Sequence, residues 1–176
     1  PEYGVENVRP YSPSQQEILR IYEDTVLNSA GDIDNDIQDI IRKFAQSDMS
    51  KRPTHSEIVR YKLWLEHRYV SPYTGQTIPL SRLFTTDYEI EHIIPQSRYF
   101  DDSLSNKVIC EAAVNKLKDN CLGYEFIQKH HGEIVDLGGG RKVQILELDS
   151  YCASVENNYK NNRSKMKKLL MEDIPS

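Results

Sequence analysis

The segment from Tyr88 to Lys116, YEIEHIIPQSRYFDDSLSNKVICEAAVNK, starts as a short strand and then places polar side chains at fixed intervals. Glu91 and His92 are adjacent at the end of the strand, and Asn106 and Asn115 follow the histidine by 14 and 23 positions. A strand, a loop with an acidic turn and a helix must fold as one compact unit to bring these side chains together. These residue types in this order predict metal-assisted phosphodiester hydrolysis.

The chemistry of that reaction assigns a role to each side chain. Mg²⁺ prefers oxygen ligands and is usually held by one or two protein oxygens plus substrate phosphate, which Glu91 and Asn115 can supply. A histidine is partly neutral near pH 7, so His92 can take a proton from an attacking water. Adjacent residues on an extended strand point to opposite faces, so we expect Glu91 and His92 to flank the scissile phosphate. Asn115 must then come from a following helix.

Taken alone, a Glu-His pair is more often an ordinary strand end, so the longer pattern carries the argument. HIIPQS is followed by DDS, NKV and VNK, and SPYTGQTIPLSRLF precedes them from Ser71 to Phe84. This order and spacing resemble the HNH nuclease family, in particular the HNH domain of type II RNA-guided CRISPR effector endonucleases. The resemblance implies an α+β fold, with a ββα-metal core and a small antiparallel β-hairpin surrounded by α-helices.

The resemblance also implies roles for individual residues. His92 would be the general base, and Glu91 and Asn115 would be ligands of Mg²⁺, for which Mn²⁺ can substitute. Asn106 would brace the histidine loop rather than bind the metal. Many members carry aspartate immediately before the histidine, so the longer Glu91 can change the metal distance or the denticity of the carboxylate.

The cysteines and lysines of the chain complete the expected site. Some HNH proteins hold a structural zinc with paired CxxC motifs, but no two cysteines here have that spacing, and we predict no structural zinc. Cys110 is expected to be a small apolar packing residue, and the three cysteines fit a reducing cytoplasm. Lys107, Lys116 and Lys118 lie within the motif and are candidate phosphate contacts. Each of them fits a solvated surface lysine equally well.

We expect residues 1–70 to form a helical linker arm. Ser12 can cap a first helix that has proline at its first position. Asp32 can cap a second apolar stripe, and the capping box at Thr54 opens a third helix that runs through Trp64.

We expect residues 71–148 to form the HNH nuclease core and a following hairpin. The turn Tyr73-Thr74-Gly75-Gln76 starts the core, and a helix is expected from Leu122 to His131. Apolar runs on both sides of Gly138-Gly139-Gly140 predict a hairpin. Residues 149–176 predict a C-terminal helix and linker.

The charge bears on the expected partners. The net charge is −5, and residues 1–50 carry ten acidic against four basic side chains, which is unfavourable for binding DNA alone. The resemblance implies that guide RNA and the remaining domains of a parent effector present target-strand DNA in a guide RNA–DNA heteroduplex. We expect an excised, soluble, monomeric domain from the cytoplasm of a prokaryote, used in antiviral defence. The sequence has no membrane-spanning run and no signal peptide.

Two other functions stay open at the level of sequence. A stand-alone HNH nuclease of the homing or restriction kind would need a basic reading helix or a zinc-linked module. A non-catalytic docking module would keep the nuclease fold while Glu91 fails to hold a metal.

Overall fold

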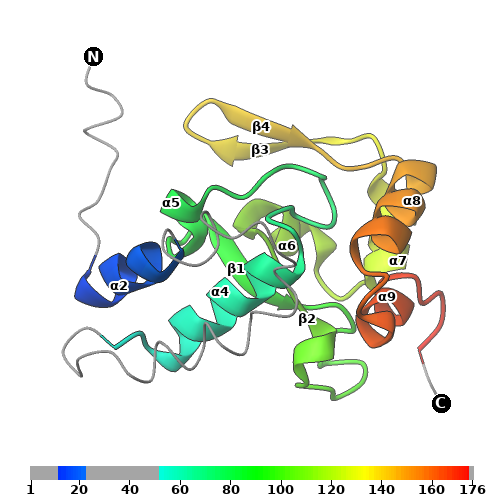
Figure 1. Ribbon diagram of the computed structural model, residues 1–176. Helices are drawn as coiled ribbons and strands as arrows, with labels where there is room; N and C mark the ends of the chain where they lie inside the picture. Colours follow the sequence, from blue (N-terminus) through cyan, green and yellow to red (C-terminus); the bar gives the residue numbers. More distant parts are fainter. Residues whose placement is uncertain (1–11, 23–51, 175–176) are drawn as a thin grey trace. The chain divides into compact units, whose positions relative to one another are not determined.

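The computed structural model describes residues 12–22 and 52–174 of a chain that divides into two compact units, Pro1–Lys62 and Leu63–Ser176 (Figure 1). Two small antiparallel sheets lie among helices, which confirms the predicted α+β class. The division falls at Lys62, whereas the sequence placed the start of the core at residue 71; the predicted boundaries stay a prediction. No helix in the described ranges is both long and apolar enough to cross a bilayer.

The first unit contains α2 (Pro13–Ile21), which begins where the sequence predicted. The hydroxyl of Ser12 accepts a hydrogen bond from the backbone N–H of Gln15 at 3.2 Å, and the Gln15 side chain accepts one from the N–H of Ser12 at 3.3 Å. Proline at the first position needs no hydrogen-bond acceptor for its nitrogen. The predicted second helix after Asp32 lies outside the described residues.

The next described helix, α4 (His55–Glu66), starts with a second capping box. The Thr54 hydroxyl accepts a hydrogen bond from the N–H of Glu57 at 3.2 Å, and the N–H of Thr54 donates to the Glu57 carboxylate at 3.0 Å. The predicted start is therefore confirmed. The helix continues past its predicted end at Trp64.

A tight turn lies at residue 71, where the sequence predicts that the core begins. The N–H of Ser71 donates to the carbonyl of Gln76 at 2.9 Å, and Gly75 has φ +70, a left-handed conformation that suits glycine. The buried carboxylate of Glu111 accepts hydrogen bonds from the hydroxyls of Ser71 at 2.5 Å and Thr74 at 2.7 Å. This buried carboxylate ties the turn to the strand that ends at Glu111.

A ββα unit follows the short helix α5 (Leu80–Leu83). The strands β1 (Tyr88–His92) and β2 (Lys107–Glu111) pair antiparallel, and α6 (Ala112–Lys118) follows β2 directly (Figure 1). The connection between the strands ends in a single 3₁₀ turn, η3 (Leu104–Asn106). This is the predicted strand, loop and helix, and the helix carries the second predicted asparagine.

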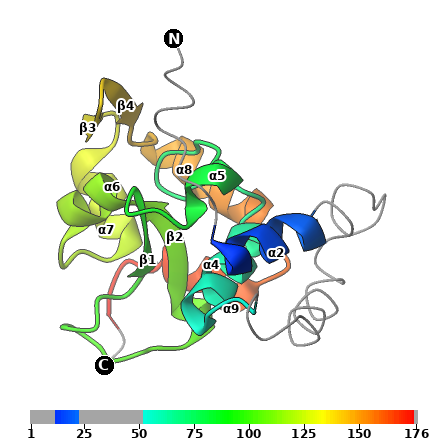
Figure 2. The ribbon, with the colours of Figure 1, turned by 90° about the vertical axis from the view of Figure 1, so that its left-hand side faces the viewer.

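The remainder of the second unit contains a separate hairpin and three helices. After α7 (Gly123–His130), the strands β3 (Ile134–Gly138) and β4 (Arg141–Gln144) pair antiparallel as predicted around the glycines, apart from β1 and β2 (Figures 1 and 2). Two helices, α8 (Leu148–Asn158) and α9 (Arg163–Leu169), complete the described chain.

The prediction of one long helix from Asp149 onward is wrong. The chain leaves helical geometry at Tyr159, and Asn162 starts a new helix by accepting a hydrogen bond from the N–H of Lys165 at 3.2 Å. Asparagine side chains compete for backbone groups and favour caps over helix interiors. The asparagine-rich stretch between the two helices therefore breaks the pattern that we interpreted as continuous.

One hydrophobic core joins the elements of the second unit. Cys110 is fully buried there, which agrees with its predicted packing role, and burial raises the pKa of its thiol well above the usual value. The hydroxyl of Tyr151 donates to the carbonyl of Leu169 at 2.7 Å and so links α8 to α9. The buried members of this core are Tyr73, Ile93, Val108, Cys110, Val114, Phe126, Ile127, Ile145, Tyr151, Val155, Tyr159 and Leu169.

Candidate active site

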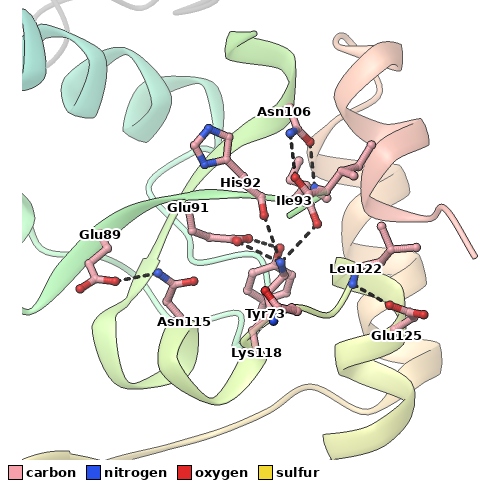
Figure 3. Close-up of polar contacts among 12 residues, drawn as sticks. Tyr73, Glu89, Glu91, His92, Ile93, Asn106, Asn115, Lys118, Leu122 and Glu125 are labelled. Carbon is pink, nitrogen blue, oxygen red and sulfur yellow. Dashed lines mark hydrogen bonds and ion pairs between the residues drawn. The ribbon is translucent and has the colours of Figure 1, made fainter. Parts of the chain in front are cut away.

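The polar side chains at the end of β1 point to two sides of the ββα unit. Glu89 and Glu91 contact residues of α6, whereas His92 contacts Asp102 in the loop between the strands. Figure 3 shows the Glu91 and His92 side chains leaving the strand in opposite directions. This is the alternation expected of an extended strand.

Glu91 is a buried carboxylate with a partner at each oxygen. It is 4% exposed, and its Oε1 accepts a hydrogen bond from the hydroxyl of Tyr73 at 2.5 Å while its Oε2 lies 3.0 Å from the ammonium of Lys118 (Figure 3). Burial raises the pKa of the Glu91 carboxyl, and the nearby Lys118 charge and the Tyr73 hydrogen bond oppose that rise. The structure thus gives Glu91 two protein partners.

Lys118 connects this carboxylate to the backbone that carries the histidine. Its ammonium donates to the carbonyls of His92 at 3.1 Å and Ile93 at 3.2 Å in addition to its ion pair with Glu91 (Figure 3). The residue is 1% exposed. These partners differ from the predicted phosphate, because the ammonium has almost no surface that a phosphate could reach.

His92 is accessible and is held from the loop side. Its Nε2 lies 2.9 Å from Oδ1 of Asp102, which also pairs with the ammonium of Lys107 at 3.1 Å. The hydrogen bonds from His92 and Lys107 lower the pKa of the Asp102 carboxyl. An ionised carboxylate at Nε2 favours the tautomer with its proton on that nitrogen, which leaves Nδ1 as the basic atom.

Asn106 is fully buried and binds the loop that follows His92. Its Oδ1 accepts a hydrogen bond from the N–H of Ile94 at 2.9 Å, and its Nδ2 donates to the carbonyls of Ile94 at 3.1 Å and Asp101 at 2.8 Å (Figure 3). These bonds span both ends of the loop. They support the bracing role expected from the sequence.

The structure places Asn115 beside a carboxylate that the sequence analysis did not assign to the site. Its Nδ2 donates to Oε1 of Glu89 at 2.6 Å (Figure 3), and Glu89 is exposed. The two-residue spacing from Glu91 was the available signal, because it places both glutamates on one side of the strand. Of the predicted phosphate-contact lysines, Lys116 is exposed on α6.

These side chains offer oxygen donors suited to a hard divalent cation. Carboxylate and amide oxygens are the protein ligands that Mg²⁺ prefers, and one or two suffice when water and phosphate fill the remaining positions. Residues 12–22 and 52–174 contain no group of three or more His, Cys, Asp or Glu side chains arranged to hold a metal. A metal here would therefore rely on the amide oxygen of Asn115 and on few carboxylates.

The sequence model of one family, described as HNH endonuclease, matches residues 71–124. The matched stretch begins at the turn tied to β2 and ends just after α6, so it contains all the side chains described above. This stretch is an HNH endonuclease domain. The HNH domain thus supplies the general base candidate, the buried carboxylate and both asparagines from one continuous segment.

Two curated relatives of the HNH domain are bacterial Cas9 proteins. The chain is 37% identical over 68 residues to "CRISPR-associated endonuclease Cas9 1" of Streptococcus thermophilus, and 38% identical over 69 residues to "CRISPR-associated endonuclease Cas9" of Campylobacter jejuni. These alignments cover 38% and 39% of this chain but only 6% and 7% of the relatives. The HNH domain is therefore of the kind found in Cas9-type endonucleases, and the chain corresponds to a small part of such proteins.

The fold of the chain is also similar to that of part of a Cas9 protein. A crystal structure of Streptococcus thermophilus Cas9 in complex with the AGAA PAM covers 96% of this chain with a TM-score of 0.60 and 22% sequence identity. Only 15% of that longer chain is covered. At this identity the similarity concerns the fold.

Proposed function

We propose that the HNH domain cleaves the DNA strand that pairs with a guide RNA, as the target-strand nuclease of a Cas9-type effector. The observation that carries this proposal is the placement of His92 and Asn115 on two sides of β1, within the stretch that matches the HNH endonuclease model. Phosphodiester hydrolysis needs a base for the attacking water and a positive charge at the phosphate. His92 can serve as the base on one side, and a cation held with the help of Asn115 can supply the charge on the other.

His92 performs the proton transfer in this mechanism. Asp102 holds Nε2, so Nδ1 takes the proton from a water aligned with the scissile phosphate. Asn115 and a carboxylate of β1, Glu91 in the assignment from sequence, would hold a single Mg²⁺ or Mn²⁺ ion. When bound, this cation neutralises the charge that develops on the phosphate. As the new bond from water to phosphorus forms, the bond to the 3′ oxygen breaks and that oxygen takes up a proton, so the products carry a 5′-phosphate and a 3′-hydroxyl.

The charges of the chain support a mechanism in which other parts of the effector, rather than the HNH domain, bind the DNA. The chain has a net charge of −5, whereas DNA affinity depends mainly on cations that neutralise phosphates. Lys107 is paired with Asp102 and Lys118 with Glu91, which leaves Lys116 as the exposed member of the three predicted phosphate contacts. Guide RNA and the other effector domains would therefore hold the heteroduplex, in the cytoplasm of a prokaryotic cell.

A non-catalytic docking module remains the second candidate, and one observation favours it. Both oxygens of Glu91 already have protein partners. If no other carboxylate served the metal, the HNH domain would keep its fold and lose its cofactor.

The test is strand cleavage by the assembled effector under single-turnover conditions. His92→Ala should lower the rate on the guide-paired strand by roughly 10²- to 10⁴-fold, the usual contribution of a general base. His131→Ala is the matched control, because His131 is exposed, pairs with Glu147 and lies outside the matched stretch. An unchanged rate in His92→Ala would reject the proposed mechanism, and absence of target-strand cleavage by the unmodified effector would favour the docking module.

A further inference from the structure

We propose that the aromatic side chains of Tyr99 and Phe100 pack against the substrate beside the scissile phosphate, on the sugars and base edges of the guide RNA–DNA heteroduplex. This inference rests on the proposed function, because it names a further part of the surface that receives the same substrate. The two residues lie in the loop between β1 and β2, which is the side of the strand that His92 contacts.

Tyr99 and Phe100 form an exposed apolar patch. In the described ranges, Phe100 is the most exposed of the large apolar side chains at 77%, and the adjacent Tyr99 is 42% exposed. Single exposed apolar residues are common and need no explanation, but two adjacent aromatic rings beside an active-site base form a patch that a partner can cover. Removing this apolar surface from water would favour binding of that partner.

The loop is held by hydrogen bonds on both sides of the aromatic pair. Before the pair, Arg98 donates to the carbonyl of Asn120 at 2.9 Å and to the carboxylate of Glu125 at 2.5 Å. After the pair, the carbonyl of Asp101 accepts a hydrogen bond from Nδ2 of Asn106 at 2.8 Å. The backbone that carries the rings is therefore ordered before a partner binds, which lowers the entropy cost of binding.

The position of Phe100 in the chain places it near the nucleotides that flank the scissile phosphate. Oδ1 of Asp102 lies 2.9 Å from Nε2 of His92. Phe100 precedes Asp102 by two residues, so their Cα atoms are at most about 7 Å apart. Successive nucleotides of one strand rise by about 3.4 Å along the helix axis. A phosphate that His92 serves therefore brings the one or two neighbouring nucleotides close to this loop.

The charges around the loop favour nucleic acid as the partner. Helix α9 packs against η3 at the end of the loop and exposes Arg163 and Lys167, one helical turn apart. Cations of this kind neutralise backbone phosphates, which is the main source of affinity for nucleic acids. The two acidic residues of the loop each pair with a lysine, at 3.9 Å for Asp101 and 3.1 Å for Asp102, so their repulsion of phosphate is reduced.

The form of the heteroduplex decides which of its surfaces the rings contact. An A-form duplex has a deep, narrow major groove that side chains do not enter, and a wide, shallow minor groove that displays sugars and base edges. Pairing and stacking cover the faces of the bases. The rings of Tyr99 and Phe100 therefore lie against sugars and base edges in the minor groove.

Photo-cross-linking in the assembled effector tests the contact directly. The photoreactive residue p-benzoylphenylalanine replaces Phe100, and His92→Ala in the same chain leaves the substrate uncut. Irradiation should join position 100 to the target strand or the guide RNA within about two nucleotides of the scissile phosphate. The same photoreactive residue in place of Ile134 is the matched control, because Ile134 is 61% exposed and lies outside the stretch that matches the HNH model. It should give no cross-link at that place.

Single-turnover cleavage by the effector measures what the contact contributes. Phe100→Ala should slow cleavage of the guide-paired strand about fivefold or more, because a weaker contact lowers the fraction of effector in which the strand lies at His92. Phe100→Trp should rescue most of the rate, since it restores an aromatic surface, and Ile134→Ala should leave the rate unchanged. Phe100→Ala should not lower the melting temperature, because the ring is 77% exposed.

The outcomes separate this inference from the proposed function. A cross-link from position 100 to protein would mean that another effector domain covers the rings, and it would overturn the inference, as would the absence of any cross-link. An unchanged rate in Phe100→Ala, or no rescue by Phe100→Trp, would overturn it as well. If the unmodified effector cuts no target strand, the proposed function fails, whereas the cross-link needs no cleavage and still decides whether the rings contact the heteroduplex.

Discussion

Replacing Lys118 by methionine removes the cation that three oxygen atoms share. The ammonium lies 3.0 Å from Oε2 of Glu91, 3.1 Å from the carbonyl of His92 and 3.2 Å from that of Ile93. Methionine has a similar length and fills the same space without charge. The variant therefore tests the electrostatic contribution of the side chain with little change in packing.

The expected loss follows from burial. Lys118 is 1% exposed and Glu91 is 4% exposed, so removal of the lysine leaves an uncompensated carboxylate in the interior. Removing one partner of a buried pair costs about 3 to 5 kcal/mol of unfolding free energy. Whole domains are stable by only about 5 to 15 kcal/mol, so the loss should be large and easily measured.

Urea unfolding monitored by tryptophan fluorescence is the suitable assay. The chain has a single tryptophan, and Trp64 is buried with its indole N–H donating to the carbonyl of Ile78 at 2.8 Å. Lys116→Met is the matched control: it lies on the same helix but is exposed, so its effect should stay within about 0.5 kcal/mol.

A double variant separates charge from packing. Glu91→Gln/Lys118→Met removes both charges and should recover part of the stability lost in Lys118→Met, with an interaction energy of about 1 to 3 kcal/mol. A loss below about 1 kcal/mol in Lys118→Met, or a loss equal to that of Lys116→Met, would refute the view that Lys118 organises this site.

Two further predictions concern other buried polar groups. Asn106→Ala removes hydrogen bonds to Ile94 and Asp101 and should lower the unfolding free energy by about 3 kcal/mol, whereas lost cleavage without lost stability would contradict its bracing role. Burial and the charge of Lys165, 3.3 Å away, hold the pKa of His67 well below its usual range. Below about pH 6.5, His67 therefore binds a proton in the unfolded chain but stays neutral in the folded chain. Below about pH 6.5, the unfolding free energy should therefore decrease as the pH is lowered, by up to about 1.4 kcal/mol per pH unit. His67→Gln should remove that part of the pH dependence, measured by urea unfolding.

The local elements could be predicted because their signals are local. The box at Thr54 and Glu57 needs only neighbouring residues, and the structure forms it as expected. Gly138, Gly139 and Gly140 all have positive φ, and together with the apolar runs on both sides they predicted the hairpin. Asn162 shows the limit of this reasoning, because an asparagine inside a polar stretch can either continue a helix or start a new one.

The contacts of the site depend on residues that are far apart in sequence. Tyr73 reaches Glu91 across 18 positions, and Lys118 meets the same carboxylate from a helix that follows the second strand. No spacing rule connects these three residues, so their mutual contacts could not be predicted, and the roles of Glu91 as a ligand and Lys118 as a phosphate contact stay predictions. Residue types and a family resemblance can identify a reaction, but the allocation of partners inside the site required the folded chain.

Lys118 contacts the main-chain carbonyls of positions 92 and 93, and the imidazole takes no part in those hydrogen bonds. The hydrogen bonds from Lys118 that hold the backbone at the base therefore do not depend on the side chain that this backbone displays. A variant without the imidazole should keep these backbone contacts and its strand register while losing turnover, although it gives up the contact with Asp102. The same anchoring would let an experimenter exchange the side chain at this position, for a spectroscopic probe or an unnatural base, without rebuilding the scaffold beneath it.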